Sequence, residues 1–234
     1  MKPTRFITAV AIACVVSLTG TGAQTPAAVK AFTGARLIDG TDRAPIPDAT
    51  IVVRGGRIVR AGPSSSVQVP AGAERIALNG KTVIPGLINA HGHVNTPDQD
   101  LKTYAAYGVT TVFSLGGEGA PHFVARDSQN TPTLNRSRIF VAGPVVAATT
   151  PAAAREEVAK VHAMKADLVK IRVDDNLGTS PKMTSAVYTA VIDEAHKRGL
   201  RVAAHLYYLE DAKGLLDAGA DFIAHSIRDA DVSP

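Results

Sequence analysis

The sequence of 234 residues contains one cysteine, Cys14, and no run rich in Lys and Arg. Cys14 lies inside an apolar run over residues 6–18, so a chain cleaved after that run carries no thiol. Such a chain has no disulfide, no cysteine nucleophile and no thiolate metal ligand. The formal net charge is only +4. This mild charge, without a basic run, argues against a nucleic-acid-binding protein.

The N-terminal segment has the pattern of a secretory signal peptide over residues 1–23. Lys2 and Arg5 provide a basic start, the apolar run is too short to span a bilayer, and small residues precede a cleavage position after Ala23. The sequence therefore predicts an exported protein, periplasmic or secreted, without a stable membrane span after cleavage. A retained membrane anchor and lipidation at Cys14 are the alternatives.

Residues 24–84 predict a small β domain without helices. Two β-branched runs, over 49–53 and 58–59, flank Gly55-Gly56, which is typical of a hairpin. Asn79-Gly80 lies between two further short apolar runs and predicts a second hairpin of the same kind.

Residues 85–234 alternate apolar strands with helical segments, a rhythm typical of a parallel α/β sheet. Six strands are predicted near residues 88, 111, 140, 170, 203 and 223. Helices are predicted over 101–107, 150–164, 180–198 and 210–218, two of which open with a capping residue and a proline. Six strands fit either an open doubly wound sheet or six-eighths of a barrel, and the pattern alone does not decide between them.

Side chains that can bind a metal ion follow several of these strands. His91 and His93 end the first strand, and His205 and His225 end the fifth and sixth. Active sites of parallel α/β proteins lie at that edge of the sheet. His91 and His93 leave the same face of an extended segment, so two neutral imidazoles could share one divalent ion. Solvated or hydrogen-bonded structural histidines are the alternative reading of each.

Lys170 lies on one face of the fourth strand, opposite an aliphatic face formed by residues 169, 171 and 173. If the aliphatic face meets helices, Lys170 points inward, where an ammonium without a partner is costly. Addition of CO2 to the amine would produce a carbamate, an anion with two oxygens that could bridge two cations. An ion pair with Asp174 or Asp175 is the alternative.

Tyr207 lies two residues after His205 and could share its face, where a phenol can donate a hydrogen bond to a carbonyl oxygen that gains charge. Ordinary packing explains Tyr207 equally well. The remaining histidines, His122, His162 and His196, are predicted to be surface residues.

Several segments resemble the amidohydrolase superfamily, most closely its imidazolonepropionase-like and Xaa-Pro dipeptidase-like branch. They are residues 83–94, 107–112, 168–171, 204–207 and 218–225. The resemblance implies an incomplete TIM-type (β/α)8 barrel of about six of eight units, preceded by the N-terminal part of the family's small composite β domain. It also implies two divalent ions, usually zinc, held by His91, His93, His205 and His225 and bridged by Lys170 as its CO2-derived carbamate.

The implied activity is that of a metal-dependent amidohydrolase, in which a metal-activated hydroxide attacks the amide C–N bond of a dipeptide or cyclic amide and Tyr207 assists. The family continues through two more strands to a proton-shuttling aspartate, which Asp229 and Asp231 lie too close to His225 to replace. We therefore expect a C-terminally truncated chain with impaired or no activity. The alternatives are a metal-binding fragment without catalysis and an exported, metal-free α/β binding protein. Unpaired strand edges also predict a homo-oligomer.

Overall fold

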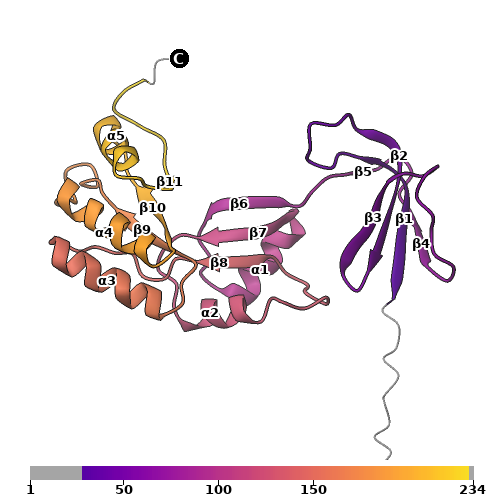
Figure 1. Cartoon of the computed structure of the whole chain (residues 1–234), viewed down its shortest axis with the longest axis horizontal. Coiled ribbons are helices and arrows are strands. Elements are labelled where there is room, and N and C mark those ends of the chain that lie inside the picture. The colour runs from indigo at the N-terminus through magenta and orange to yellow at the C-terminus, as the bar shows by residue number, and fades with distance from the viewer. Residues whose placement is uncertain (1–27, 232–234) are drawn as a thin grey trace, which may run out of the picture.

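The computed structural model describes residues 28–231 as a β sheet followed by a mixed α/β unit (Figure 1). The predicted signal peptide over residues 1–23, including Cys14, lies outside these residues. No helix within 28–231 is long and apolar enough to cross a membrane.

The first unit is a five-stranded sheet. Its strands are β1 (Val29–Leu37), β2 (Ile46–Arg54), β3 (Arg57–Pro63), β4 (Glu74–Ala77) and β5 (Thr82–Val83). β1, β2 and β3 pair antiparallel in sequence order. Gly55 and Gly56 connect β2 to β3 with positive φ angles of 56° and 76°, a backbone conformation that glycine adopts without a steric penalty. The first predicted hairpin is therefore confirmed.

The second predicted hairpin, at Asn79-Gly80, is wrong. β4 and β5 each pair in parallel with β1 and not with each other. The Leu78 N–H donates to the Thr33 carbonyl, and the Asn79 side chain lies against Gly34 of β1, where a Cβ would leave no room. Turn residues predict that the chain bends at this point. The free edge of β1 determines which strand the segment after the bend pairs with.

The second unit contains all six strands predicted after residue 85. They alternate with helices in the order β6 (Leu87–Gly92), α1 (Pro97–Ala106), β7 (Val109–Ser114), α2 (Ala120–Asp127), β8 (Arg138–Val141), α3 (Pro151–Ala163), β9 (Leu168–Arg172), α4 (Ser185–Lys197), β10 (Arg201–His205), α5 (Leu209–Asp217) and β11 (Phe222–Ile223). The strands form two parallel sheets of three, β6-β7-β8 and β9-β10-β11. A bridge between Val146 and Ile171 links the chain after β8 to β9.

The capping residues in the sequence predict the start of α3 correctly and the start of α4 wrongly. Thr150 caps α3 as predicted, because its side chain accepts a hydrogen bond from the Ala153 N–H at 3.2 Å. The start of α4 at Ser180 is wrong, since the helix begins at Ser185. The Met183 N–H instead donates to the Val173 carbonyl at 2.9 Å, which keeps the preceding segment along the end of β9. Helix α2 was not predicted, and its N-cap is a glycine without a capping side chain.

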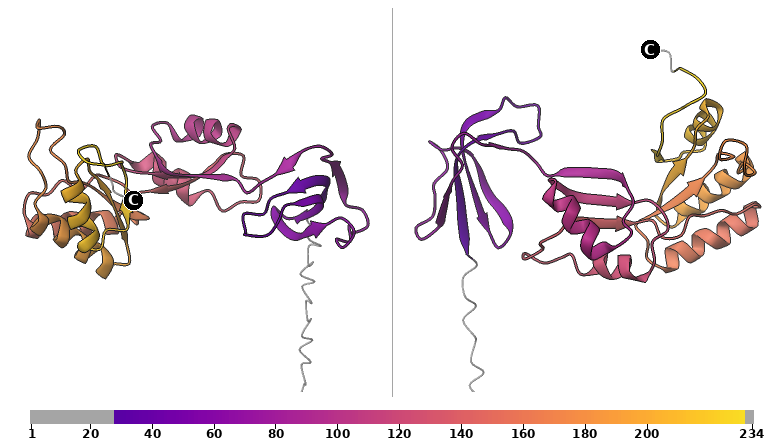
Figure 2. Two further views of the ribbon diagram at one scale, coloured as in Figure 1. Left: turned by 90° about the horizontal axis from the view of Figure 1, so that it is seen from above. Right: turned by 180° about the vertical axis from the view of Figure 1, so that it is seen from behind.

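The main core lies between the sheet of β9 to β11 and the helices α3 and α4, which cover one face of that sheet (Figure 2). Val169 and Ile171 point into this core and are fully buried. Burial of each aliphatic side chain contributes about 1.5–3 kcal/mol. Because side chains alternate along a strand, this packing directs Lys170 to the opposite face, as the sequence predicts.

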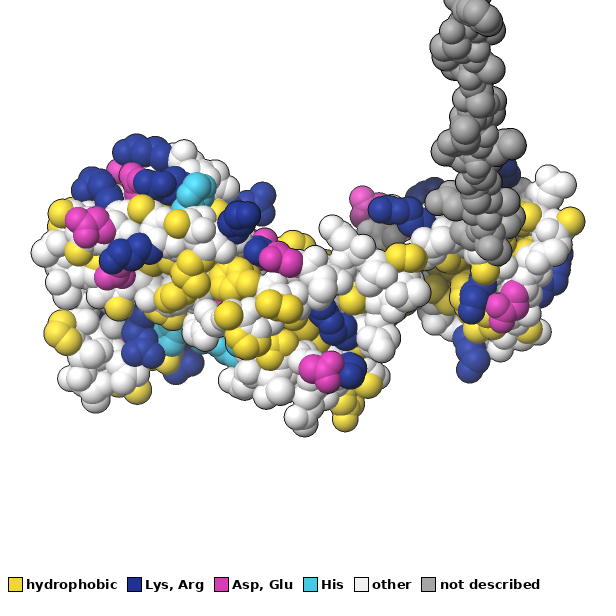
Figure 3. Space-filling view, turned by 90° about the horizontal axis from the view of Figure 1, so that it is seen from below, with side chains coloured by type: hydrophobic (Ala, Val, Ile, Leu, Met, Phe, Trp, Pro, Cys, Tyr) yellow, Lys and Arg dark blue, Asp and Glu magenta, His cyan; other side chains and the backbone are white. Residues whose placement is uncertain are grey.

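β6 is an edge strand of its sheet and carries exposed apolar side chains. Leu87 and Ile88 are 52% and 65% exposed. On the face drawn in Figure 3, hydrophobic side chains gather across the middle of the molecule. An open apolar edge favours pairing with a further strand, so homo-oligomer formation stays a prediction.

Candidate metal centre

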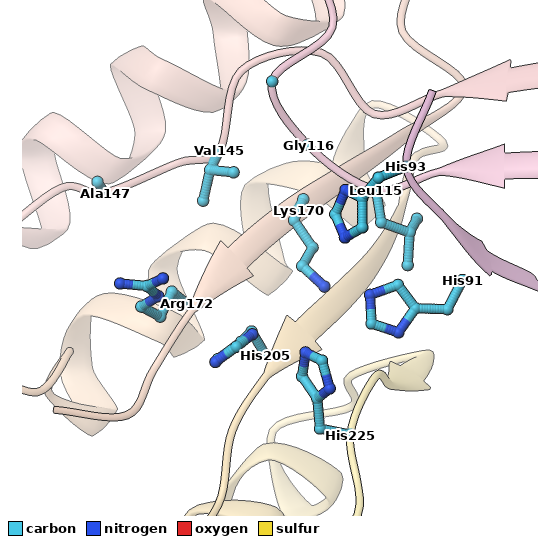
Figure 4. Close-up of a pocket in the computed structure, with 11 residues that line it drawn as sticks. His91, His93, Leu115, Gly116, Val145, Ala147, Lys170, Arg172, His205 and His225 are labelled. Atoms are coloured by element: carbon cyan, nitrogen blue, oxygen red, sulfur yellow. The ribbon is translucent and has the colours of Figure 1, made fainter. Parts of the chain in front are cut away.

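The structure brings together the five side chains that the sequence predicts as metal ligands (Figure 4). His91 lies near the end of β6, Lys170 lies in β9 and His205 ends β10, while His93 and His225 follow β6 and β11. All five line one cavity of about 540 Å³. They meet because the carboxyl ends of the parallel strands lie at the same edge.

The histidine rings are close neighbours. The centroids of His205 and His225 lie 4.2 Å apart, those of His91 and His225 4.7 Å, and those of His91 and His93 5.4 Å. The Nδ1 atom of His91 lies 2.8 Å from the Ala224 carbonyl oxygen. A carbonyl only accepts, so Nδ1 carries the proton and Nε2 keeps its lone pair. This bond also ties the end of β6 to the chain after β11.

Burial and neighbouring positive charge lower the pKa of three of these imidazoles, His91, His205 and His225. Burial lowers the pKa of His91 and of His205, and the positive charge of Lys170 lowers both further, although the Asp174 carboxylate opposes the lowering at His205. Burial, followed by the charges of His205 and His91, lowers the pKa of His225 to about 4. A metal ion binds only the unprotonated imidazole, so the cluster is ready to donate lone pairs at neutral pH.

Lys170 is 4% exposed, and its Nζ has no hydrogen-bond partner among residues 28–231. Burial lowers its pKa from 10.5 to about 8, against an opposing effect of Glu118. No ion pair joins Lys170 to Asp174 or Asp175 in the described part of the chain, so that alternative is wrong. A buried amine with a lowered pKa can react with CO2, because only the neutral form is nucleophilic.

Asp174 is a buried carboxylate that the sequence suggested only as a partner for Lys170. It is 1% exposed, and its Oδ2 lies 3.0 Å from His205 Nε2. The two atoms are close, although their alignment is not that of a hydrogen bond. The other oxygen, Oδ1, accepts from the Asn176 N–H at 2.8 Å. Asp174 therefore orients His205 and anchors the loop after β9, a role that its position on the Lys170 face of the strand could have indicated.

The chemistry of the donor set fits a divalent cation. Four neighbouring imidazoles suit zinc, and a carbamate on Lys170 would satisfy the orphaned buried nitrogen and add two oxygens. No three His, Cys, Asp or Glu side chains within 28–231 are already arranged to hold an ion. The side chains and their electrostatics, and not a preformed geometry, support metal binding here.

Tyr207, predicted to assist catalysis, lies beside the cluster. Its ring centroid is 4.9 Å from that of His205, and the Arg228 guanidinium lies 3.9 Å from the centroid of the Tyr207 ring. Tyr207 is not among the residues that line the cavity, so its role stays a prediction.

The prediction that His122 is a surface residue is wrong. It is 8% exposed in α2, where Nε2 lies 2.7 Å from the Val94 carbonyl and Nδ1 accepts from the Gly119 N–H. This histidine holds the start of α2 against the chain after β6. His162 and His196 are exposed as predicted, and His196 contacts Asp221 at 3.0 Å.

The low pKa of His225 predicts that the metal-free protein loses stability in mild acid. Between pH 6.5 and 4 the unfolded chain binds a proton at this residue and the folded chain does not, so the free energy of unfolding falls as pH falls. Allowing for partial exposure, we expect a loss of about 1 kcal/mol from this residue between pH 7 and pH 5. Urea unfolding at both pH values should show a smaller loss in His225→Gln than in wild type, whereas His162→Gln should behave as wild type. Equal losses in wild type and His225→Gln would contradict the assignment.

No family model matches the chain, but individual proteins do. The chain is 28% identical over 204 residues to an uncharacterized protein of Mycobacterium tuberculosis, a match that covers 77% of this chain and 53% of that protein. It is also 28% identical over 197 residues to the enamidase of Eubacterium barkeri, covering 73% of this chain and 47% of the enamidase. The chain therefore spans about half the length of these curated relatives.

Solved structures show the same arrangement of elements. A candidate prolidase from Bifidobacterium longum superposes with a TM-score of 0.74 at 29% identity, covering 84% of this chain and 54% of the prolidase. A Xaa-Pro dipeptidase with methionine in its active site superposes with a TM-score of 0.69 at 24% identity, covering 83% and 60%.

The fold and the site define an α/β protein whose strand ends present a cluster of histidines around a buried lysine. These relatives and neighbours are consistent with the amidohydrolase superfamily, which the motifs of the chain resemble.

Proposed function

We propose that the protein is a metal-dependent hydrolase of carbon–nitrogen bonds that acts on the amide bond of a dipeptide or cyclic amide. The observation that carries the proposal is that four histidines line one cavity with the Lys170 amine, which has no hydrogen-bond partner within residues 28–231. The names of the enamidase and of the Xaa-Pro dipeptidase support hydrolysis of C–N bonds.

In this proposal residues 85–234 form about six units of a (β/α)8 barrel, and residues 24–84 form the N-terminal part of the family's small composite β domain. The bridge between Val146 and Ile171, which joins the two parallel sheets, supports a curved, barrel-like arrangement. The hydrogen bond between His91 and Ala224 supports it further, since it brings the first and last strand ends together. An exported location is part of the same proposal.

His91, His93, His205, His225 and Lys170 as its carbamate would hold two divalent cations. Bound cations would polarise the amide carbonyl and lower the pKa of water. The chain's own residues prepare this site. Burial lowers the pKa of His91, the Ala224 carbonyl holds the His91 ring in one orientation, and Leu115 and Val145 supply apolar cavity wall. The Tyr207 hydroxyl would donate a hydrogen bond to the carbonyl oxygen as it gains charge.

A metal-binding protein without catalysis is the second candidate. It is favoured by the absence of any carboxylate from the cavity wall within residues 28–231, because proton transfer to a leaving amine commonly uses such a group.

Metal content and turnover test the proposal together. Protein produced with zinc and bicarbonate should contain two ions per chain and hydrolyse members of a dipeptide panel, and chelation should abolish hydrolysis until zinc is restored. Elemental analysis by mass spectrometry and amine release provide the two readouts. Folded protein with no bound metal would rule out both candidates and leave a metal-free binding protein. Two ions without turnover of dipeptides, cyclic amides or lactones would leave the second candidate.

A further inference from the structure

Arg172 is a charged side chain of the cavity wall that has no partner in the described structure. It lies two residues after Lys170 on the same face of β9 and is exposed. Its guanidinium lines both the central cavity and an adjoining cavity of about 480 Å³. Figure 4 shows Arg172 between Ala147 and His205. None of the hydrogen bonds or ion pairs formed among residues 28–231 involves the Arg172 guanidinium.

The surroundings of Arg172 are cationic. Lys170 lines the same cavity, and the Arg228 guanidinium lies nearby, 3.9 Å from the centroid of the Tyr207 ring. Two buried carboxylates of this region are already engaged. Both oxygens of Glu118 accept from the Gly116 N–H, and Asp174 contacts His205 and Asn176. Within the described residues, no carboxylate pairs with the exposed guanidinium of Arg172.

We propose that Arg172 binds a carboxylate of the substrate, so that the protein acts on amides that carry a carboxylate close to the scissile bond, such as dipeptides and N-acyl amino acids. The proposal rests on the proposed hydrolase function for the position of the scissile bond. A guanidinium binds a carboxylate through two parallel N–H···O bonds. Positions 170 and 172 of the strand are about 6.6 Å apart, which suits a carboxylate on the carbon next to the amide nitrogen.

The adjoining cavity provides the space that such a substrate needs. It lies between the chain before α3 and the loop before α4, with Ala148, Pro181 and Met183 among its walls. Arg172 and Ala147 belong to both cavities. A carboxylate held at Arg172 would therefore place the side chain of the leaving amino acid in the adjoining cavity and keep the amide in the central one.

Binding of a matched pair of small probes tests the inference without relying on turnover. N-acetylglycine and N-acetylglycinamide differ only in having a carboxylate or a neutral carboxamide. Isothermal titration of the purified chain should show at least about tenfold tighter binding of the carboxylate probe, as expected for charge-assisted hydrogen bonds. Arg172→Gln should reduce the ratio to about twofold or less, and Arg172→Lys should retain part of it.

Arg201→Gln is the matched control, because Arg201 is also exposed but lies at the opposite end of β10, paired with Leu168. It changes the net charge equally and should keep the full preference. A preference that survives Arg172→Gln, or equal or undetectable binding of both probes by wild type, would overturn the inference. Turnover of neutral amides without a carboxylate preference would overturn it and leave the hydrolase function intact. A preference dependent on Arg172 in a protein without turnover would support it and count against the hydrolase function.

Discussion

Replacing Lys170 by Met is expected to abolish amide hydrolysis and, at the same time, to raise the stability of the metal-free protein. The amine is 4% exposed and has no hydrogen-bond partner among residues 28–231. The lowering of its pKa from 10.5 to about 8 corresponds to a cost of at most about 3 kcal/mol for the ammonium form. Met fills a similar volume without a polar atom, so we expect a gain of about 1–2 kcal/mol at pH 7.

The pH dependence of stability separates this explanation from improved packing. Below pH 8 both the folded and the unfolded chain carry the charged lysine, and the cost of burying it is fully present. Between pH 8 and 10.5 the unfolded chain binds more protons at this residue, so the free energy of unfolding of the wild type rises with pH. Urea unfolding of metal-free protein at pH 7.5 and 9.5 should show this rise in wild type and lose it in Lys170→Met.

Activity should respond in the opposite direction. Met cannot form a carbamate, so the two oxygens proposed to bridge the cations are lost. We expect hydrolysis to fall by at least about 10³-fold, which corresponds to about 4 kcal/mol of transition-state stabilisation. Lys102→Met, which changes an exposed lysine paired with Asp98, should leave activity and stability nearly unchanged. Full activity in Lys170→Met would refute the role of the carbamate. A loss of stability greater than about 1 kcal/mol would refute the claim that burial of the Lys170 ammonium destabilises the metal-free protein.

Replacing Asp174 by Ala is expected to destabilise the protein by about 3 kcal/mol and to weaken metal binding. The carboxylate is 1% exposed, and its removal takes away the neighbour of the buried His205 Nε2 and the acceptor of the Asn176 N–H. Asn176 and Leu177 both have positive φ angles, 52° and 59°. Since non-glycine residues adopt this conformation at a cost, the bond from Asn176 to Asp174 helps to hold it.

The effect on metal binding follows from the contact with His205. Residues that orient a ligating histidine commonly change metal affinity 10- to 100-fold, so zinc affinity of Asp174→Ala should fall within about that range. Asp174→Asn keeps the shape and one acceptor oxygen, and should recover most of the stability. Asp175→Asn is the control, because Asp175 accepts from the Tyr208 hydroxyl at 2.7 Å and does not contact the cluster. Unfolding curves and competitive zinc titration are the measurements, and equal effects of changing Asp174 and Asp175 would contradict the assignment.

Local pattern was sufficient to predict where the chain forms its elements and which face each strand buries. Six strands after residue 85 lie where apolar runs predict them. The alternation of Val169, Lys170 and Ile171 predicted the inward direction of the lysine, because successive side chains of a strand point to opposite faces of the sheet. The location of the histidines at strand ends likewise follows from the sequence alone. The carboxyl ends of parallel strands lie at the same edge of a sheet, so residues at these ends are expected to be neighbours.

Only the tertiary structure decided which groups meet across that edge. Strand pairing made β4 and β5 partners of β1, although their turn residues favoured a hairpin. Packing buried His122 and moved the start of α4 to Ser185, because distant carbonyls offered hydrogen bonds that no local pattern reveals. The choice of His205 and not Lys170 as the partner of Asp174, and the unpaired guanidinium of Arg172, depend on register between strands far apart in sequence. The sequence specifies which hydrogen-bond donors and charged groups the protein has. Which of these groups are paired depends on the distances between them in the folded chain.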